Sequence, residues 1–540
     1  MSTTRWLESH APRGMVASPH VLASQSGVAA MHAGGNALDA AIAAAATIAV
    51  VYPHMNGVGG DNFWLIHDAT SSRLTALCGA GRAARAASIE WYAARGISDS
   101  IPARGGPAAL TVPGVVDGWW QAHQYSSRSM GSTLTWKSLL ADAIAYAREG
   151  FSASAGQRVA PPREPDLFGP TAIAAIKQDL WPLYHPDVLG QGPLVQRDLA
   201  LTLEAVRDGG PDAFYGGEIA RRIVAAAAQA GSPLRMEDLA EHRSDWMEPL
   251  RIGYGKGQAA SFPPPAQGMS ALAMLAIADG FDVSELGEAD YVHLLVETAK
   301  LAFEDRDRYL TDPAWMERSP AELLAPERIA QLRARLNMDR ALPTGQARAT
   351  GGDTIAIVTA DAQGNAVSLI QSLYFTWGSG LVAGNTGVVL QNRGAFFSLD
   401  PTQANALAPG KRTMHTLIPS MYLEAGRPRF VYGTMGGEGQ PQTQAALLTR
   451  RLDRDLGPQA CVEAPRWLYG RTWGTPSRAL NLEGRYEAGL VHDLAARGHD
   501  VQVGKEWDDL FGHAHCIWLD PDGGLVGGSD PRADGAALGC

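Results

Sequence analysis

The chain has 540 residues, of which 46% are hydrophobic and 19% are charged, so it is long enough to bury a large core. Its formal net charge of -11 argues against nucleic acid or an anionic membrane surface as a partner. A pocket with one well-placed arginine can still bind a small anionic substrate. The four cysteines show no CxxC spacing, which indicates free thiols in a reducing compartment rather than a disulfide framework or a zinc ribbon.

The N-terminal region predicts no export signal. Residues 1–20 lack the apolar core of a signal peptide, and the most apolar stretch, residues 40–51, is too short to span a bilayer. That stretch is typical of a buried helix, which we expect to begin near residue 36 and to end near residue 53. A glycine loop and a strand at residues 63–66 should follow. The sequence therefore predicts a cytoplasmic protein.

The middle of the chain is predicted to be mostly helical and the end to be rich in strands. Residues 291–309 have an apolar face opposite a charged one, and a helical pattern continues through residues 320–350 before it decays. Later helices are expected at residues 442–452 and 487–497. Short strands are expected at residues 355–359, 366–370, 387–391, 429–433 and 516–519. No clean linker appears, so we expect one α/β unit despite a length that would suit about three or four domains.

Residues 351–354, Gly-Gly-Asp-Thr, precede one of these strands and form a candidate nucleophile site. A threonine hydroxyl is a weak nucleophile without an adjacent base. If the chain is cut before Thr354, the new α-amine becomes that base, because it titrates near pH 7.7–8.0. The glycine pair supplies an open peptide for the cut, and the strand would fix the threonine afterwards.

A second candidate lies at residues 433–439, Gly-Thr-Met-Gly-Gly-Glu-Gly, between a predicted strand and a predicted helix. Adjacent backbone N–H groups in such a turn can stabilise the oxyanion that develops in acyl transfer. A tight strand–helix turn without a catalytic role is the alternative. A phosphate-binding loop fits less well, because no GK[ST] follows.

With these motifs in place, nearly the whole chain resembles the γ-glutamyltranspeptidase family of N-terminal nucleophile hydrolases. The similar segments are residues 17–24, 34–41, 53–63, 262–268, 299–313, 353–367, 377–392, 410–412, 433–440 and 527–539. The resemblance implies a four-layer αββα sandwich and self-cleavage between Asp353 and Thr354. It further implies a large subunit, residues 1–353, and a small subunit, residues 354–540, that stay together as one intertwined unit.

The resemblance also assigns catalytic roles. Thr354 would be the nucleophile and, through its α-amine, the base; Gly436 and Gly437 would form the oxyanion hole, and Ser372 would position the nucleophile. No cofactor is expected. A metal site at His513 and His515 is not expected either, because alternating residues that enter a strand explain this pair better. A Ser-His-Asp hydrolase is disfavoured, because no GxSxG elbow is present.

The substrate pocket departs from the family pattern. Tyr374 and Phe396 stand where the family has the asparagine and aspartate that bind an α-ammonium group, and His415-Thr416 replaces its serine pair. Arg393 replaces a glutamine. Charge-assisted hydrogen bonds contribute about 1.5–3 kcal/mol each, so the loss of both ammonium-binding groups disfavours a γ-glutamyl ligand.

The replacements predict a substrate with a carboxylate and no α-amine. Arg393 can bind a carboxylate with two hydrogen bonds, His415 and Thr416 can donate to it, and Tyr374 and Phe396 would fill the rest of the space. The alternatives are a structural ion pair for Arg393 and core packing for the two aromatic residues. These substitutions are similar to the oxamate amidohydrolase branch of the family. That branch implies hydrolysis of oxamate to oxalate and ammonia in purine nitrogen catabolism.

Three other functions stay open at this point. They are a γ-glutamyl hydrolase or transpeptidase acting on glutathione-like compounds, an acylase for another amide, and an unprocessed family member that serves as a non-catalytic scaffold. The expected partners are a small amide and the two cleaved subunits themselves, with a dimer of such heterodimers as one further assembly. No nucleic-acid or membrane partner is expected.

Overall fold

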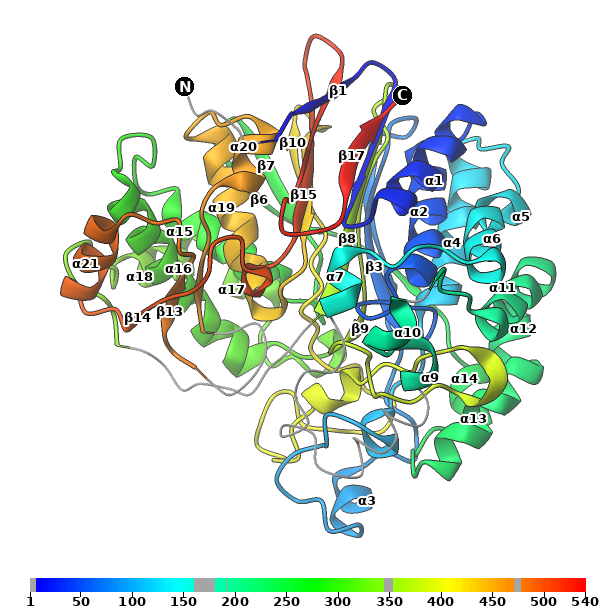
Figure 1. The fold of residues 1–540 in the computed structure, drawn as a ribbon. Helices are drawn as coiled ribbons and strands as arrows, with labels where there is room; N and C mark the ends of the chain where they lie inside the picture. Colours follow the sequence, from blue (N-terminus) through cyan, green and yellow to red (C-terminus); the bar gives the residue numbers. More distant parts are fainter. Residues whose placement is uncertain (1–5, 160–179, 191, 344–352, 471–476) are drawn as a thin grey trace.

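The computed structural model describes residues 6–159, 180–190, 192–343, 353–470 and 477–540. Its centre is formed by two seven-stranded antiparallel sheets that pack face to face, and helices cover the outer face of each sheet (Figure 1). The structure confirms the predicted αββα sandwich. Within the described residues, no helix is both long and apolar enough to cross a lipid bilayer.

The first sheet contains the candidate nucleophile. In order, its strands are β17 (Ala536–Gly539), β2 (Gly14–Ser18), β8 (Asp353–Asp361), β9 (Ala366–Tyr374), β3 (Asp61–Asp68), β4 (Arg73–Gly79) and β5 (Asp245–Met247). β8 pairs with β2 on one side and with β9 on the other. From Thr354 onwards, β8 is buried as far as its last residue, Asp361.

The second sheet contains the strand that leads to the glycine turn. Its strands are β1 (Ser9–Ala11), β16 (Leu525–Ser529), β15 (Ala514–Leu519), β11 (Arg427–Thr434), β10 (Ser420–Glu424), β7 (Gly257–Ser261) and β6 (Leu250–Tyr254). Three short strands, β12 (Trp467–Tyr469), β13 (Leu480–Leu482) and β14 (Val501–Val503), form a separate small sheet. Both large sheets combine strands that precede residue 354 with strands that follow it, so the N-terminal two thirds contribute more strands than the one expected at residues 63–66.

The outer face of the first sheet is covered by several helices, of which α2 (Ala37–Val51) is buried along its whole length. Asn36 caps it, accepting hydrogen bonds from the backbone of Leu38 and Asp39, and its many alanines allow close packing on β8 and β9. The other helices on this side are α1 (Val21–His32), α4 (Val115–Ser129), α5 (Trp136–Leu139), α6 (Ala141–Glu149), α11 (Arg197–Gly209), α12 (Pro211–Tyr215) and α13 (Glu218–Gln229).

Helices on the other side of the sandwich include the predicted long helix, which the structure extends to α16 (Glu288–Tyr309). Its companions are α15 (Gly268–Ala278), α17 (Pro320–Leu323), α18 (Pro326–Arg333), α19 (Gln440–Leu452), α20 (Pro458–Glu463) and α21 (Ala488–Ala496). Further short helices are α3 (Ile89–Ala93), α7 (Ala155–Val159), α9 (Trp181–Tyr184), α10 (Pro186–Leu189), α14 (Met236–Ala240), η1 (Gly106–Ala108), η3 (Pro313–Trp315), η4 (Gly384–Thr386), η5 (Arg393–Phe396), η6 (Gly437–Gly439) and η7 (Asp509–Phe511).

Most predicted elements are confirmed, but two are corrected. Residues 387–391 form no strand; only Val389 makes an isolated bridge, to Val382, because Gly387 has a positive φ of 67° and turns the chain back on the segment before it. The helical pattern of residues 320–350 is broken into α17 and α18, which ends at Arg333, because prolines begin both helices. Residues 344–352 lie outside the described residues.

A buried ion network supports the loop before β15. Asp530 accepts hydrogen bonds from the backbone N–H of Ala514 at 2.7 Å, from Arg532 at 3.0 Å and from Arg466. Arg466 also donates to the carbonyl of Phe511 at 3.0 Å. Burial alone would raise the pKa of Asp530, but the charges of Arg466 and Arg532 outweigh it and hold this pKa well below its ordinary value.

We expect Asp530→Asn to lower the free energy of unfolding by about 3–5 kcal/mol, because it leaves the buried Arg466 without its counterion. The stability that Asp530 provides is present above its unfolded pKa of about 3.9 and is lost as the pH falls toward its depressed folded value. The urea midpoint at pH 7 measures the effect. Asp455→Asn, at an exposed ion pair, is the matched control; equal midpoint shifts in the two variants would contradict the expectation.

Candidate active site

Thr354 lies at the start of β8, opposite an irregularity in β9. Asp353 pairs with Tyr374 and Ile355 pairs with Gln371, so two residues of β9, Ser372 and Leu373, face the single Thr354. Such bulges redirect side chains and are frequent beside active sites. The Thr354 hydroxyl donates to Ser372 Oγ at 3.2 Å, and the same oxygen accepts the Tyr374 backbone N–H at 2.8 Å. Ser372 is thus placed where it orients the hydroxyl of Thr354.

Tyr374 ends β9 in an unusual conformation. It is 1% exposed and has a φ of 84°, in the left-handed region that non-glycine residues rarely adopt. Residues held in this way cluster at functional sites. Its ring stacks on Phe375 at 4.4 Å and meets Phe396 edge to face at 5.6 Å. The predicted aromatic pair, Tyr374 and Phe396, therefore forms one surface.

Arg393 begins η5 and is almost completely buried, at 1% exposure. Its guanidinium carbon lies 4.1 Å from the ring centroid of Tyr374, and its Nη1 donates to Thr416 Oγ1 at 3.4 Å. Its Nε and Nη2 have no hydrogen-bond partner among the described residues. Burial lowers the pKa of Arg393 to about 10, which still leaves it charged at neutral pH. A buried cation with two open donors is suited to bind an anion.

His415 and Asp61 lie next to Arg393. The Nε2 atom of His415 is 3.5 Å from Asp61 Oδ2, and neither that oxygen nor either ring nitrogen has a hydrogen-bond partner among the described residues. Burial, together with the charge of Arg393, lowers the pKa of His415 well below its ordinary value, so the ring is neutral. Burial also raises the pKa of Asp61 to about 7, despite the opposing effect of Arg393.

The glycine turn follows β11 at the interface between the sheets. A Cβ on Gly433 would lie 3.3 Å from the Cβ of Ala356. This end of β11 therefore packs directly on β8, two residues after Thr354. Gly436 has a φ of 125° and Gly437 a φ of 51°, conformations that favour glycine, and α19 begins shortly afterwards. The turn predicted to form the oxyanion hole is thus a sharp strand-to-helix connection.

Gln267 joins the glycine turn to Thr416, the partner of Arg393. Its Nε2 donates to the carbonyl of Gly437 at 2.9 Å and to the carbonyl of Thr416 at 3.1 Å. Its Oε1 accepts a hydrogen bond from Arg306 at 3.2 Å. A continuous set of contacts therefore leads from Thr354 through β9, Arg393 and Thr416 to the glycine turn.

The structure brings together most of the predicted site residues, while their catalytic and binding roles stay predictions. Phe396 is only partly buried, and Asp353 is the first residue of β8. Gly351 and Gly352 lie outside the described residues. Sequence reasoning missed Gln267 and Asp61, although both stand in segments that carried the family resemblance, AQG and GGDN, and Asp61 is a charged residue beside two glycines.

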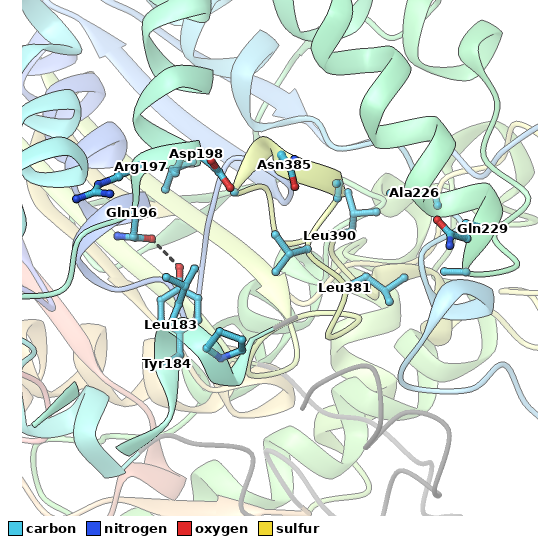
Figure 2. A pocket seen from close by; sticks show the side chains of 18 of the residues that line it. Leu183, Tyr184, Gln196, Arg197, Asp198, Ala226, Gln229, Leu381, Asn385 and Leu390 are labelled. Atoms are coloured by element: carbon cyan, nitrogen blue, oxygen red, sulfur yellow. Dashed lines mark hydrogen bonds between the residues drawn. The ribbon is translucent and has the colours of Figure 1, made fainter. Parts of the chain in front are cut away.

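A separate cavity of about 840 Å³ lies beside α11 and α13 (Figure 2). Tyr184 and Gln196, joined by a hydrogen bond of 2.6 Å, form part of its wall, and Leu381 and Leu390 form another part. None of the predicted site residues lines it. The cavity borders the loop that leads to Arg393, but its lining carries none of the chemistry described above.

Comparison with known proteins agrees with this arrangement. The family model described as gamma-glutamyltranspeptidase matches residues 23–540. The chain is 42% identical to the oxamate amidohydrolase proenzyme of Klebsiella pneumoniae and 41% identical to the glutathione hydrolase-like YwrD proenzyme of Bacillus subtilis; each match covers 97% of this chain and 98% of the relative. The crystal structure of cephalosporin acylase from Bacillus halodurans superimposes with a TM-score of 0.89 at 35% identity, covering 100% of this chain and 98% of that one.

We expect Gln267→Ala to lower the free energy of unfolding by about 2–4 kcal/mol, because two buried carbonyls and Arg306 each lose a hydrogen bond. Urea denaturation followed by tryptophan fluorescence measures the change. Gln229→Ala, at an exposed position of α13, is the matched control and should change stability by less than about 0.5 kcal/mol. Wild-type stability in Gln267→Ala would show that the turn and the pocket are not linked through this side chain.

Proposed function

Since the chain belongs to the γ-glutamyltranspeptidase family and is a hydrolase of amide bonds, we propose that it cleaves a small amide that carries a carboxylate, with Thr354 as the nucleophile. The best candidate substrate is oxamate, which would give oxalate and ammonia. The observation that carries this proposal is Arg393, a buried cation whose Nε and Nη2 have no partner among the described residues.

The enzyme forms by self-cleavage in this proposal. In the continuous chain the nitrogen of Thr354 belongs to a peptide bond; cleavage after Asp353 converts it into an α-amine. The products are a large subunit, residues 1–353, and a small subunit, residues 354–540. The two remain associated, because β8 of the small subunit stays paired with β2 of the large one, and β9 stays paired with β3.

The reaction is an acyl transfer to water. The α-amine of Thr354 takes the hydroxyl proton while Oγ1 attacks the amide carbonyl, and Ser372 holds that hydroxyl in place. The N–H groups of Gly436 and Gly437 stabilise the oxyanion, where each such donor contributes about 2.7–4 kcal/mol. Ammonia leaves with the proton from the amine, and water activated by the same amine then hydrolyses the acyl ester.

The pocket explains why a carboxylate without an α-amine is favoured. Arg393 supplies two donors and Thr416 a hydroxyl, whereas the aromatic surface of Tyr374 and Phe396 stands in place of ammonium-binding groups. A γ-glutamyl substrate would bury its ammonium group against this surface at a cost in free energy. A γ-glutamyl hydrolase or transpeptidase and an acylase for another amide are the outcomes that the substrate test separates from this proposal.

We further propose a cellular compartment, a pathway and an assembly for the enzyme. The four cysteines are free thiols, which suits a reducing cytoplasm. The setting that we propose is the catabolism of purine nitrogen, in which hydrolysis of oxamate would release ammonia. The working unit is the pair of cleaved subunits, with a dimer of such pairs as its assembly.

Thr354→Ala should leave the chain intact and inactive, because both the attacking oxygen and the cleavage step are lost. A denaturing gel should show residues 1–353 and 354–540 as separate fragments for the wild type and a single chain for the variant. Thr354→Ser keeps a hydroxyl and serves as the control, with cleavage retained. Fragments from Thr354→Ala, or an uncut wild type that releases ammonia, would contradict the proposed nucleophile.

The substrate is tested by ammonia release from oxamate, its neutral analogue oxamide, and γ-glutamyl amides. We expect the wild type to prefer oxamate and Arg393→Ala to lower kcat/KM for oxamate by about 10- to 150-fold, as expected for the loss of charge-assisted hydrogen bonds. Oxamide turnover and self-cleavage should change little. Equal oxamate activity in the variant would refute the role of Arg393, and a preference for γ-glutamyl amides would favour the alternative function.

A further inference from the structure

The carboxyl group of Asp61 faces the same pocket, and the contacts described above leave it unused by the chemistry. We propose that Asp61 is the specificity-determining residue of this site: in its protonated form it leaves Arg393 and His415 free to bind the substrate carboxylate, and in its ionised form it competes for them. This inference rests on the proposed carboxylate pocket and adds to it a proton that must be bound together with the substrate.

The two oxygens of Asp61 have different environments. Oδ1 accepts the backbone N–H of Gly81 at 3.0 Å and the amide of Gln391 at 2.9 Å, which fixes the orientation of the carboxyl group at the start of β3. Oδ2 has no hydrogen-bond partner among the described residues and lies 3.5 Å from Nε2 of His415. A proton on Asp61 therefore belongs on Oδ2, where His415 can accept it as a hydrogen bond.

The position of that proton decides what His415 offers a ligand. His415 is neutral, so it carries a hydrogen on only one ring nitrogen. If Asp61 is protonated, Oδ2 donates to Nε2 and the hydrogen of the ring is on Nδ1, which can donate to a carboxylate. If Asp61 is ionised, Nε2 carries the hydrogen and donates to Oδ2, and Nδ1 presents a lone pair that repels a carboxylate.

Charged and titratable groups surround Asp61 on several elements. Arg393 of η5 and Arg412 favour its ionised form, but Arg412 is already paired with Asp245. Burial raises the pKa of the Cys78 thiol on β4 and the pKa of the Tyr215 phenol on α12, so both stay neutral near pH 7. These neighbours leave Arg393 as the cation whose charge Asp61 opposes.

The charge of the pocket then depends on pH in a defined direction. Without ligand, the pKa of Asp61 is about 7, so below pH 7 the pocket carries the uncompensated charge of Arg393. A bound anion stabilises the protonated form and raises this pKa further. Affinity for a carboxylate is therefore highest below pH 7 and falls by up to about tenfold per pH unit above it, with uptake of one proton on binding.

Asp61→Asn imitates the protonated state without the ability to ionise. The amide oxygen of asparagine can accept from Gly81 and Gln391 as Oδ1 does, and its N–H can donate to His415 as a protonated Oδ2 would. Asp453→Asn is the matched control, because Asp453 is another aspartate whose pKa is raised by burial, and it is hydrogen-bonded to Tyr254 away from the pocket.

The test is calorimetric titration of the processed enzyme with oxalate, which is fully ionised throughout, at pH 6, 7 and 8 in two buffers of different protonation enthalpy. For the wild type and Asp453→Asn, we expect the dissociation constant to rise about fivefold from pH 7 to 8 and proton uptake to approach one per site at pH 8. Asp61→Asn should bind oxalate with a constant that does not change with pH and without proton uptake by this site.

The outcomes separate the two proposals. Oxalate that fails to bind at every pH would overturn the carboxylate pocket itself, and with it this inference. Binding without proton uptake in the wild type, or with undiminished uptake in Asp61→Asn, would overturn the role of Asp61 alone; the second result would assign the proton to the α-amine of Thr354. If Asp61→Asn does not fold, infrared difference spectra of the wild type decide: oxalate at pH 8 should produce the C=O band of a protonated carboxyl group, which an amine cannot give.

Discussion

The pairing of β8 between β2 and β9 is the constraint on which the rest of the site depends. It places Thr354 at the end of a central strand, and the irregularity in β9 sets Ser372 opposite its hydroxyl. β9 then ends at Tyr374, whose ring lies against Arg393. Because β9 is held by backbone pairing with β8 on one side and with β3 on the other, the positions of Thr354, Ser372 and Tyr374 follow from the sheet and not from mobile loops.

A buried arginine with open donors is costly to maintain in a protein interior, because burial removes the hydration of its charge. The aromatic face of Tyr374, the hydroxyl of Thr416 and the partly ionised Asp61 compensate Arg393 only in part. A ligand with a negative charge would complete this compensation. Binding energy is thus available at Arg393, where it can be used to orient a small amide.

The sequence was sufficient for the family, the sandwich and most elements, because those depend on local patterns: the apolar run of α2, the amphipathic α16 and the glycine turn at residues 436–437. It failed at residues 387–391, where an apolar stretch looks like a strand but a glycine turns it into a loop. Asp61 and Gln267 could not be assigned from sequence, because their roles come from contacts with residues more than a hundred positions away. The local sequence pattern around either residue does not predict these partners.

Both large sheets are built from segments on either side of residue 354, and this limits how the mature enzyme can form. In each large sheet, strands that follow residue 354 lie beside strands that precede it, so a polypeptide ending at residue 353 or beginning at residue 354 lacks partners for strands that are otherwise central. Expressed separately, the two pieces would expose unpaired strand edges and tend to aggregate. Folding must therefore precede the proposed cut, and a mature enzyme that unfolds should not regain its structure from the two fragments. The free energies of unfolding given above therefore refer to the uncut chain, whereas the lifetime of the mature enzyme is set by its rate of unfolding.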